Sequence, residues 1–212
     1  MFIYVSLTPA AEMTPLLPLS EEIKQISPDL VFLRLFPNTS TKVCLVENRK
    51  DSQRYILKLA DKRRNPFIPE GLYKSRLKHV QREERVLREL PDLEGITHLV
   101  EAYENDNYIA ILKEFQKGIP LNGGGTLKDY YALKRIIGSI HARGIVRIDV
   151  RYNNIIKNPG PKLYEEYESR RSSIAIIDLG SCMFHYEVTL KEFDKLARKD
   201  LSDLELIFSK SL

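Results

Sequence analysis

The sequence predicts an α+β protein in which the first half of the chain forms an antiparallel sheet and helices lead the second half. Apolar runs rich in β-branched residues alternate with short polar turns up to residue 60, and two later stretches repeat apolar residues at helical spacing. With 43% hydrophobic and 29% charged residues, a chain of 212 residues can bury one sizeable core or the cores of two small lobes.

Residues 1–30 are the least regular stretch. They contain Pro9, Pro15, Pro18 and Pro28, which favour extended or turn structure over a long helix. Ser20 followed by a polar and apolar run could cap and start a short helix there. We interpret this stretch as an extension packed on the main body.

Five β-rich runs follow. Those at 30–36, 42–47 and 54–60 are separated by short polar turns, which predicts an antiparallel meander. Those at 98–103 and 108–112 flank a short polar segment, which predicts a β-hairpin.

Two helices are predicted. The stretch 73–90 carries an apolar stripe formed by Leu77, Val80, Val86, Leu87 and Leu90. The second helix follows Thr126 and Asp129, a pair spaced as in a capping box, runs through Ile140 and stops at Gly144.

Polar residues that could carry chemistry lie beyond this second helix. A short loop presents Asp149, Arg151 and Asn154, and the apolar run 174–177 ends in Asp178 of an Asp-Leu-Gly sequence. A carboxylate at the end of a buried strand is costly without a partner. A metal ion or a cationic side chain would supply that partner.

The order of these elements and residues resembles the protein-kinase-like superfamily over about residues 31–208. The resemblance implies a two-lobed protein-kinase-like fold with an antiparallel-sheet N-lobe and a reduced, mainly helical C-lobe, with ATP in the cleft between them. Its boundaries would be an N-terminal extension over 1–30, an N-lobe over 31–115 and a C-lobe over 116–212.

The resemblance also implies roles near the catalytic loop. Asp149 matches the aspartate that accepts or orients the substrate hydroxyl proton, and Arg151 could contact the γ-phosphate. Asn154 and Asp178 match the two Mg²⁺ ligands, and oxygen donors of this kind suit that ion.

On the sheet, Lys58 matches the strand lysine that contacts the nucleotide phosphates. Its partner on the 73–90 helix could be Glu83 or Glu84. At about 100° per residue, Glu83 lies nearer the centre of the apolar stripe, and we choose it.

The remaining nucleotide contacts are less typical of the superfamily. The segment 37–42 stands where a glycine-rich loop would be, so Ser40 and Thr41 would contact phosphate with their hydroxyl and amide groups. Glu114 and Gln116 match the hinge between the lobes, where backbone groups would bind adenine.

Other departures point to an atypical kinase. Arg147-Ile148 stands where His-Arg usually precedes the catalytic aspartate, and 179–212 is short for a peptide-binding lobe. Minimal kinases with this outline include the RIO kinases, the small kinase subunits of tRNA-threonylcarbamoyladenosine complexes and lipopolysaccharide-core kinases.

We therefore expect an atypical ATP-dependent phosphotransferase, first of all a serine/threonine protein kinase acting on a protein substrate. One alternative is a small-molecule or sugar kinase. Another is an ATP-binding or ATP-hydrolysing subunit that supports a partner complex.

Composition excludes other classes. No apolar run approaches the ~20 residues of a membrane span, and Cys44 and Cys182 show neither a disulfide framework nor metal-ligand spacing. We expect a cytoplasmic protein.

The net charge of +4 permits an acidic partner. A basic group of side chains could bind RNA, although such runs usually mark solvated surface. That group comprises residues 62–64, Arg76, Lys78, Arg82 and Arg85.

Overall fold

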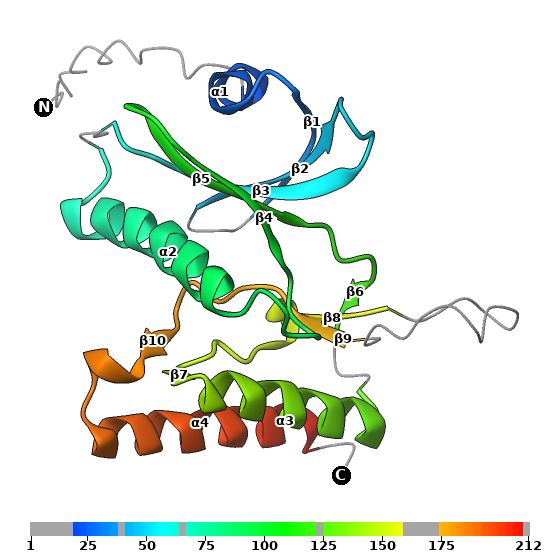
Figure 1. The fold of residues 1–212 in the computed structure, drawn as a ribbon, viewed down its shortest axis with the longest axis vertical. Coiled ribbons are helices and arrows are strands. Elements are labelled where there is room, and N and C mark those ends of the chain that lie inside the picture. Colours follow the sequence, from blue (N-terminus) through cyan, green and yellow to red (C-terminus); the bar gives the residue numbers. More distant parts are fainter. Residues whose placement is uncertain (1–18, 38–40, 64–66, 122–124, 159–173, 210–212) are drawn as a thin grey trace, which may run out of the picture.

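The structure is a computed structural model that describes residues 19–37, 41–63, 67–121, 125–158 and 174–209 (Figure 1). The expectations for residues 1–18, for Ser40 and for Arg64 of the basic group lie outside these residues. The described part is an α+β fold with a five-stranded antiparallel sheet and four α-helices.

The sheet has the strand order β1-β2-β3-β5-β4, and all its neighbouring strands are antiparallel. The predicted meander and hairpin are therefore confirmed. The strands are β1 (Leu30–Phe36), β2 (Lys42–Asn48), β3 (Arg54–Asp61), β4 (Leu99–Glu104) and β5 (Tyr108–Glu114).

Side chains alternate between the two faces of this sheet. Leu57 and Leu59 of β3 belong to an apolar cluster with Ile23 of α1 (Leu19–Ile26). Ala60 of β3 and Ile111 of β5 belong to a second cluster on the side of α2 (Glu70–Glu89). Figure 1 shows the two helices on opposite sides of the sheet. Lys58 lies between Leu57 and Leu59, so the alternation directs it toward α2.

Helix α1 confirms the short helix expected near Ser20, but it begins at Leu19, so Ser20 lies inside its first turn and is not the N-cap. Ion pairs as well as apolar contacts hold the helix on the sheet. Glu22 is 1% exposed and pairs with Lys42 at the start of β2. The Nη2 atom of Arg63 lies 3.9 Å from Oε1 of Glu22. A buried carboxylate needs such partners because burial strips it of water.

Helix α2 begins at Glu70, earlier than the Tyr73 predicted from the apolar stripe. Pro69 stands at its N-cap without a side-chain hydrogen bond, and the first turn is exposed. Neither a capping side chain nor apolar periodicity therefore marked the true start.

The second half is built on α3 (Leu127–Ala142) and α4 (Leu190–Phe208), which lie side by side at the bottom of Figure 1. The capping box predicted at Thr126 and Asp129 is present. Helix α4 was not predicted as an element, although Thr189 and Glu192 form an equivalent box. Short elements complete this half: β6 (Ile119–Pro120), β7 (Ile145–Val146), β8 (Ile155–Lys157), β9 (Ile174–Ile176), β10 (Met183–Phe184) and single 3₁₀ turns at Tyr152–Asn154 and His185–Glu187.

One apolar cluster joins the two halves. It extends from Ala60 and Val80 through Ile176 of β9 to Leu204 and Phe208 of α4. The α2 side of the sheet therefore shares its core with the α3 and α4 layer. Among the described helices, none has the length and apolar character that a bilayer crossing requires.

Candidate functional site

A network of buried charges connects β3, α2 and β5. The Nζ atom of Lys58 lies 2.6 Å from Oε2 of Glu83, and the ammonium group of Lys113 donates to Oε1 of the same carboxylate. These residues are 3%, 0% and 4% exposed, respectively. Ile56 pairs with Lys113 and Lys58 pairs with Ile111, so both lysines project from the same face of the sheet.

Helix periodicity explains why Glu83 rather than Glu84 enters this network. Glu83 shares the buried face of α2 with Val80 and Leu87. Glu84 is rotated away and instead accepts from Nη2 of Arg88, one turn later, at 2.9 Å. The expected contact between Lys58 and Glu83 is thus present.

Asp178 lies beside this network, just after β9. Its Oδ1 atom is 3.1 Å from Lys58 Nζ, 3.2 Å from His79 Nε2 and 3.0 Å from the amide nitrogen of Gly180. Burial opposes ionisation of this carboxyl, but the hydrogen bond with His79 and the charges of Lys58 and Lys113 outweigh it. The pKa of Asp178 is therefore held well below its usual range, and the group is a carboxylate.

The carboxylates around Lys58 keep its ammonium group protonated. Burial lowers the pKa of this group, but the neighbouring carboxylates of Glu83 and Asp178 raise it by more, so the pKa lies above its usual value. The site thus holds a fixed cation and a fixed anion in contact.

The predicted loop residues gather around Asp149. Asn154 donates through Nδ2 to the backbone oxygen of Asp149 at 2.9 Å and to its Oδ2 at 3.1 Å. The Nε atom of Arg151 lies 2.5 Å from the other carboxylate oxygen. A tight turn around Asp149, in which Val150 N donates to Ile148 O at 2.7 Å, presents the carboxylate.

The backbone before this turn is strained. Arg147 has φ of +61°, a left-handed conformation that side chains other than glycine rarely adopt. Such strain persists only where surrounding contacts hold it, and it gathers at functional sites. The loop is also hydrogen-bonded to the segment between β9 and Asp178, because Ile177 N donates to Asn154 O at 2.9 Å.

The residues expected to contact ATP elsewhere are less well presented. Thr41 is 5% exposed, so little of its hydroxyl surface faces a ligand in this conformation. Glu114 uses its amide to bind His98 O and its carbonyl to accept from Thr97 Oγ1, both at 3.0 Å. Gln116, two residues further on, is partly exposed. Their roles remain predictions.

Sequence reasoning missed two members of the site, His79 and Lys113. Lys113 directly follows the apolar run of β5 and is buried with it, and a charged residue at a buried position is unusual. His79 lies four residues before Glu83, which places both on one face of α2. The position of each residue in the sequence could therefore have indicated that it belongs to the site.

His79, Glu83 and Asp178 each offer a ligand atom, and these atoms lie within 4.8 Å of one another. Both carboxylate oxygens of Glu83 are already bound by lysines, so this trio is held by cationic side chains and suits a metal poorly. Asp178 and Asn154 suit one better. The contacts of Asp178 with described residues all fall on Oδ1, and Asn154 binds Asp149 through Nδ2, which leaves Oδ2 and Oδ1, respectively, as metal donors.

Two arginines of the basic group considered for RNA binding make contacts within the protein. Arg82 pairs with Glu187, and the guanidinium of Arg85 lies 4.7 Å from the ring centre of Phe184 and 5.2 Å from that of Tyr186. These contacts anchor α2 to the segment before α4.

Comparison of the chain with protein-family models and with curated proteins found no match to either. Its function must therefore be argued from the chemistry of the site.

Proposed function

We propose that the protein is an ATP- and Mg²⁺-dependent phosphotransferase with a two-lobed, protein-kinase-like fold. It would transfer the γ-phosphate of ATP to a hydroxyl group. One observation carries the proposal: the pair of Lys58 and Glu83 meets Asp178, and the backbone before Asp178 is hydrogen-bonded to the loop that presents Asp149. Phosphoryl transfer needs this combination of fixed charge and a positioned acceptor rather than covalent chemistry by the protein.

Each side chain has a role that its surroundings support. Lys58 supplies a permanent positive charge for the nucleotide phosphates, and Glu83 fixes the direction of its ammonium group. Asp149 receives or orients the proton of the attacking hydroxyl. Arg151, 73% exposed at its side chain, has the freedom to leave Asp149 and contact the transferring phosphoryl group.

Asp178 and Asn154 would hold Mg²⁺, because they present a carboxylate and an amide oxygen from adjoining segments. An ion held there would supply positive charge against the phosphates of ATP. Lys58 now contacts Asp178, so nucleotide binding would redirect its ammonium group toward phosphate.

The test combines binding with transfer. Mg²⁺ and ATP together should raise the melting temperature of the wild-type protein, and Asp178→Asn should lose most of that shift. Transfer from γ-labelled ATP should fall about a hundred- to ten-thousandfold in Asp149→Asn, because the base is lost while the nucleotide site stays intact. Asp92→Asn, an equal charge change at an exposed turn, serves as the control.

The test also separates the other possibilities. A rate of phosphate transfer equal to that of the wild type in both Asp149→Asn and Asp178→Asn would contradict the assigned roles. Mg²⁺-dependent ATP binding or hydrolysis, with no phosphate on any protein or metabolite, would instead support a nucleotide-binding subunit of a partner complex. Serine and threonine side chains of proteins are the first acceptors that the resemblance suggests.

A further inference from the structure

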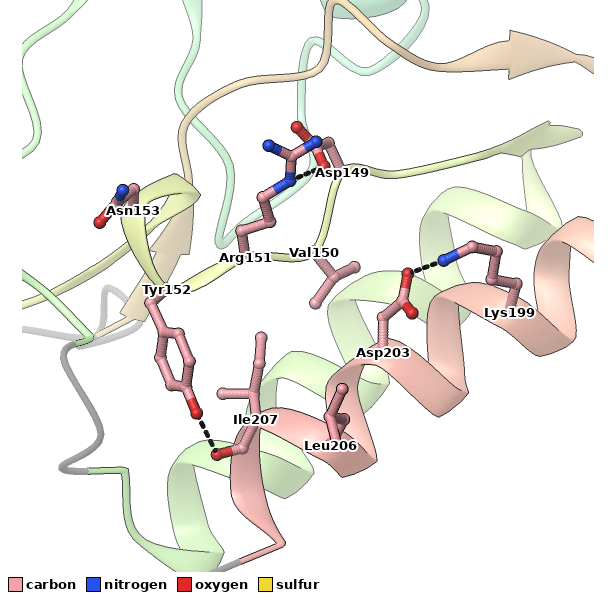
Figure 2. Close-up of a pocket in the computed structure, with 9 residues that line it drawn as sticks. All are labelled: Asp149, Val150, Arg151, Tyr152, Asn153, Lys199, Asp203, Leu206 and Ile207. Atoms are coloured by element: carbon pink, nitrogen blue, oxygen red, sulfur yellow. Dashed lines mark hydrogen bonds and ion pairs between the residues drawn. The ribbon is translucent and has the colours of Figure 1, made fainter. Parts of the chain in front are cut away.

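A hollow of about 720 Å³ lies on the α4 side of Asp149 (Figure 2). One wall is the loop that presents Asp149, and the other is one face of the second half of α4. It is lined by Asp149, Val150, Arg151, Tyr152, Asn153, Lys199, Asp203, Leu206 and Ile207. Its volume is in the range of small-molecule sites, about 300–1,000 Å³.

The two walls are held in place by a direct contact. Tyr152 Oη donates to the backbone oxygen of Ile207 at 3.2 Å, which ties the loop to the last turn of α4. Val150, 5% exposed, anchors the floor in the core. The hollow is therefore a built feature of the fold.

Its lining is divided by chemistry. Val150, Leu206 and Ile207 give an apolar patch, and the Tyr152 ring extends it. Opposite charges form two pairs: Arg151 with Asp149 at 2.5 Å, and Lys199 Nζ with Asp203 Oδ2 at 2.5 Å. Figure 2 shows the first pair on the loop and the second on the helix.

The charges set the class of ligand. Two cations and two carboxylates leave the lining without net charge, so it favours neither a strongly anionic nor a strongly cationic compound. Carboxylates accept hydrogen bonds, whereas Lys and Arg donate them. A hydroxyl group does both, and several hydroxyls on one carbon skeleton would satisfy both kinds of partner while the C–H face rests on the apolar patch.

We propose that this hollow binds the phosphate acceptor and that the acceptor is a neutral polyhydroxylated small molecule, a sugar or polyol. This inference rests on the proposed phosphotransferase function. The acceptor hydroxyl oxygen bonds to the γ-phosphorus of ATP as the bond from that phosphorus to the β,γ-bridging oxygen breaks. The hydroxyl proton passes to the Asp149 carboxylate, and ADP leaves. Asp203 and Lys199 position the acceptor through its other hydroxyls.

The experiment supplies γ-labelled ATP, Mg²⁺ and a mixture of neutral hexoses, pentoses and inositols, with a degenerate Ser/Thr peptide library in parallel. Wild-type protein should label a neutral sugar or polyol. Asp203→Asn should then raise the KM for that acceptor about tenfold, the effect of losing one charged hydrogen bond, and change kcat less. Glu205→Gln is the matched control, since it removes an equal charge from the exposed face of α4 outside the hollow.

The melting-temperature shift with Mg²⁺ and ATP, measured on the same samples, separates the two proposals. If Mg²⁺ and ATP do not shift the melting temperature of the wild-type protein, both the proposed phosphotransferase function and the proposed acceptor site are refuted. With the shift intact, labelling confined to peptides, labelling of no sugar or polyol, or equal KM values for Asp203→Asn and Glu205→Gln would overturn the acceptor inference alone. Since Asp203 is partly exposed, Asp203→Asn is expected to fold, and its unfolding curve verifies this.

Discussion

Glu83→Gln removes the carboxylate that holds Lys58 and Lys113 together inside the protein. Both ammonium groups are nearly buried, and Glu83 itself is 0% exposed. Removing one partner of a buried ion pair costs about 3–5 kcal/mol, because the remaining charge stays desolvated. For a chain of this size, about 2–4 °C is lost per kcal/mol, so the melting temperature should fall by about 6–20 °C.

The control is the neighbouring Glu84→Gln. Glu84 pairs with Arg88 one helical turn away, and the side chain of Arg88 is 60% exposed. Such a surface pair contributes about 0.5 kcal/mol or less. Urea unfolding of both variants measures the difference directly, and a Glu83→Gln loss no larger than that of Glu84→Gln would refute the reasoning.

A double substitution separates charge imbalance from lost packing. In Glu83→Gln with Lys113→Met, Lys58 remains beside the carboxylate of Asp178, and the buried charges balance again. The free energy of unfolding lost in the double variant should be smaller than the sum of the two single losses by about 1–3 kcal/mol. Additive losses would show that Glu83 and Lys113 are not coupled.

Three further predictions concern the surroundings of the site. The pKa of Asp178 is lower in the folded protein than the ~3.9 of an unfolded chain, so its stabilisation is complete above about pH 4 and is lost as pH falls further; Asp178→Asn should flatten that acid limb in urea unfolding from pH 6 to pH 3. Gly180→Ala would place a Cβ 2.4 Å from His79 Nε2 and should cost about 1–3 kcal/mol, with much of the loss recovered when His79→Ala is added; an unchanged melting temperature in Gly180→Ala would contradict the close packing. Burial raises the pKa of the Cys44 thiol to about 12 and that of Cys182 well above its usual value, so a thiol reagent should label neither in the native protein and both after denaturation.

The sheet was predictable because its signals are local. Apolar runs and polar turns specify β1 to β5, and the capping pair Thr126 and Asp129 marks the start of α3. Glu83 was separable from Glu84 because helical periodicity depends only on spacing along the chain. These residues carry their structural context in their immediate neighbours.

The remaining features depend on contacts between distant segments. Lys113 reaches Glu83 only because β5 pairs with β3, and His79 reaches Asp178 only because α2 packs over the segment after β9. The hollow beside Asp149 likewise requires α4, whose place against the loop is fixed by packing and by the Tyr152 contact. The spacing of residues along the sequence does not predict such contacts between distant segments.

The continuous core also has a consequence for synthesis of the protein. The side of the sheet that carries Ala60 shares its apolar cluster with Phe208, nearly 150 residues later in the chain. As the chain leaves the ribosome, β1 to β5 can pair early, but their α2 side cannot be fully covered until α4 emerges. A ribosome-bound chain arrested before α4 should therefore expose this apolar surface to chaperones, whereas one arrested beyond α4 should not.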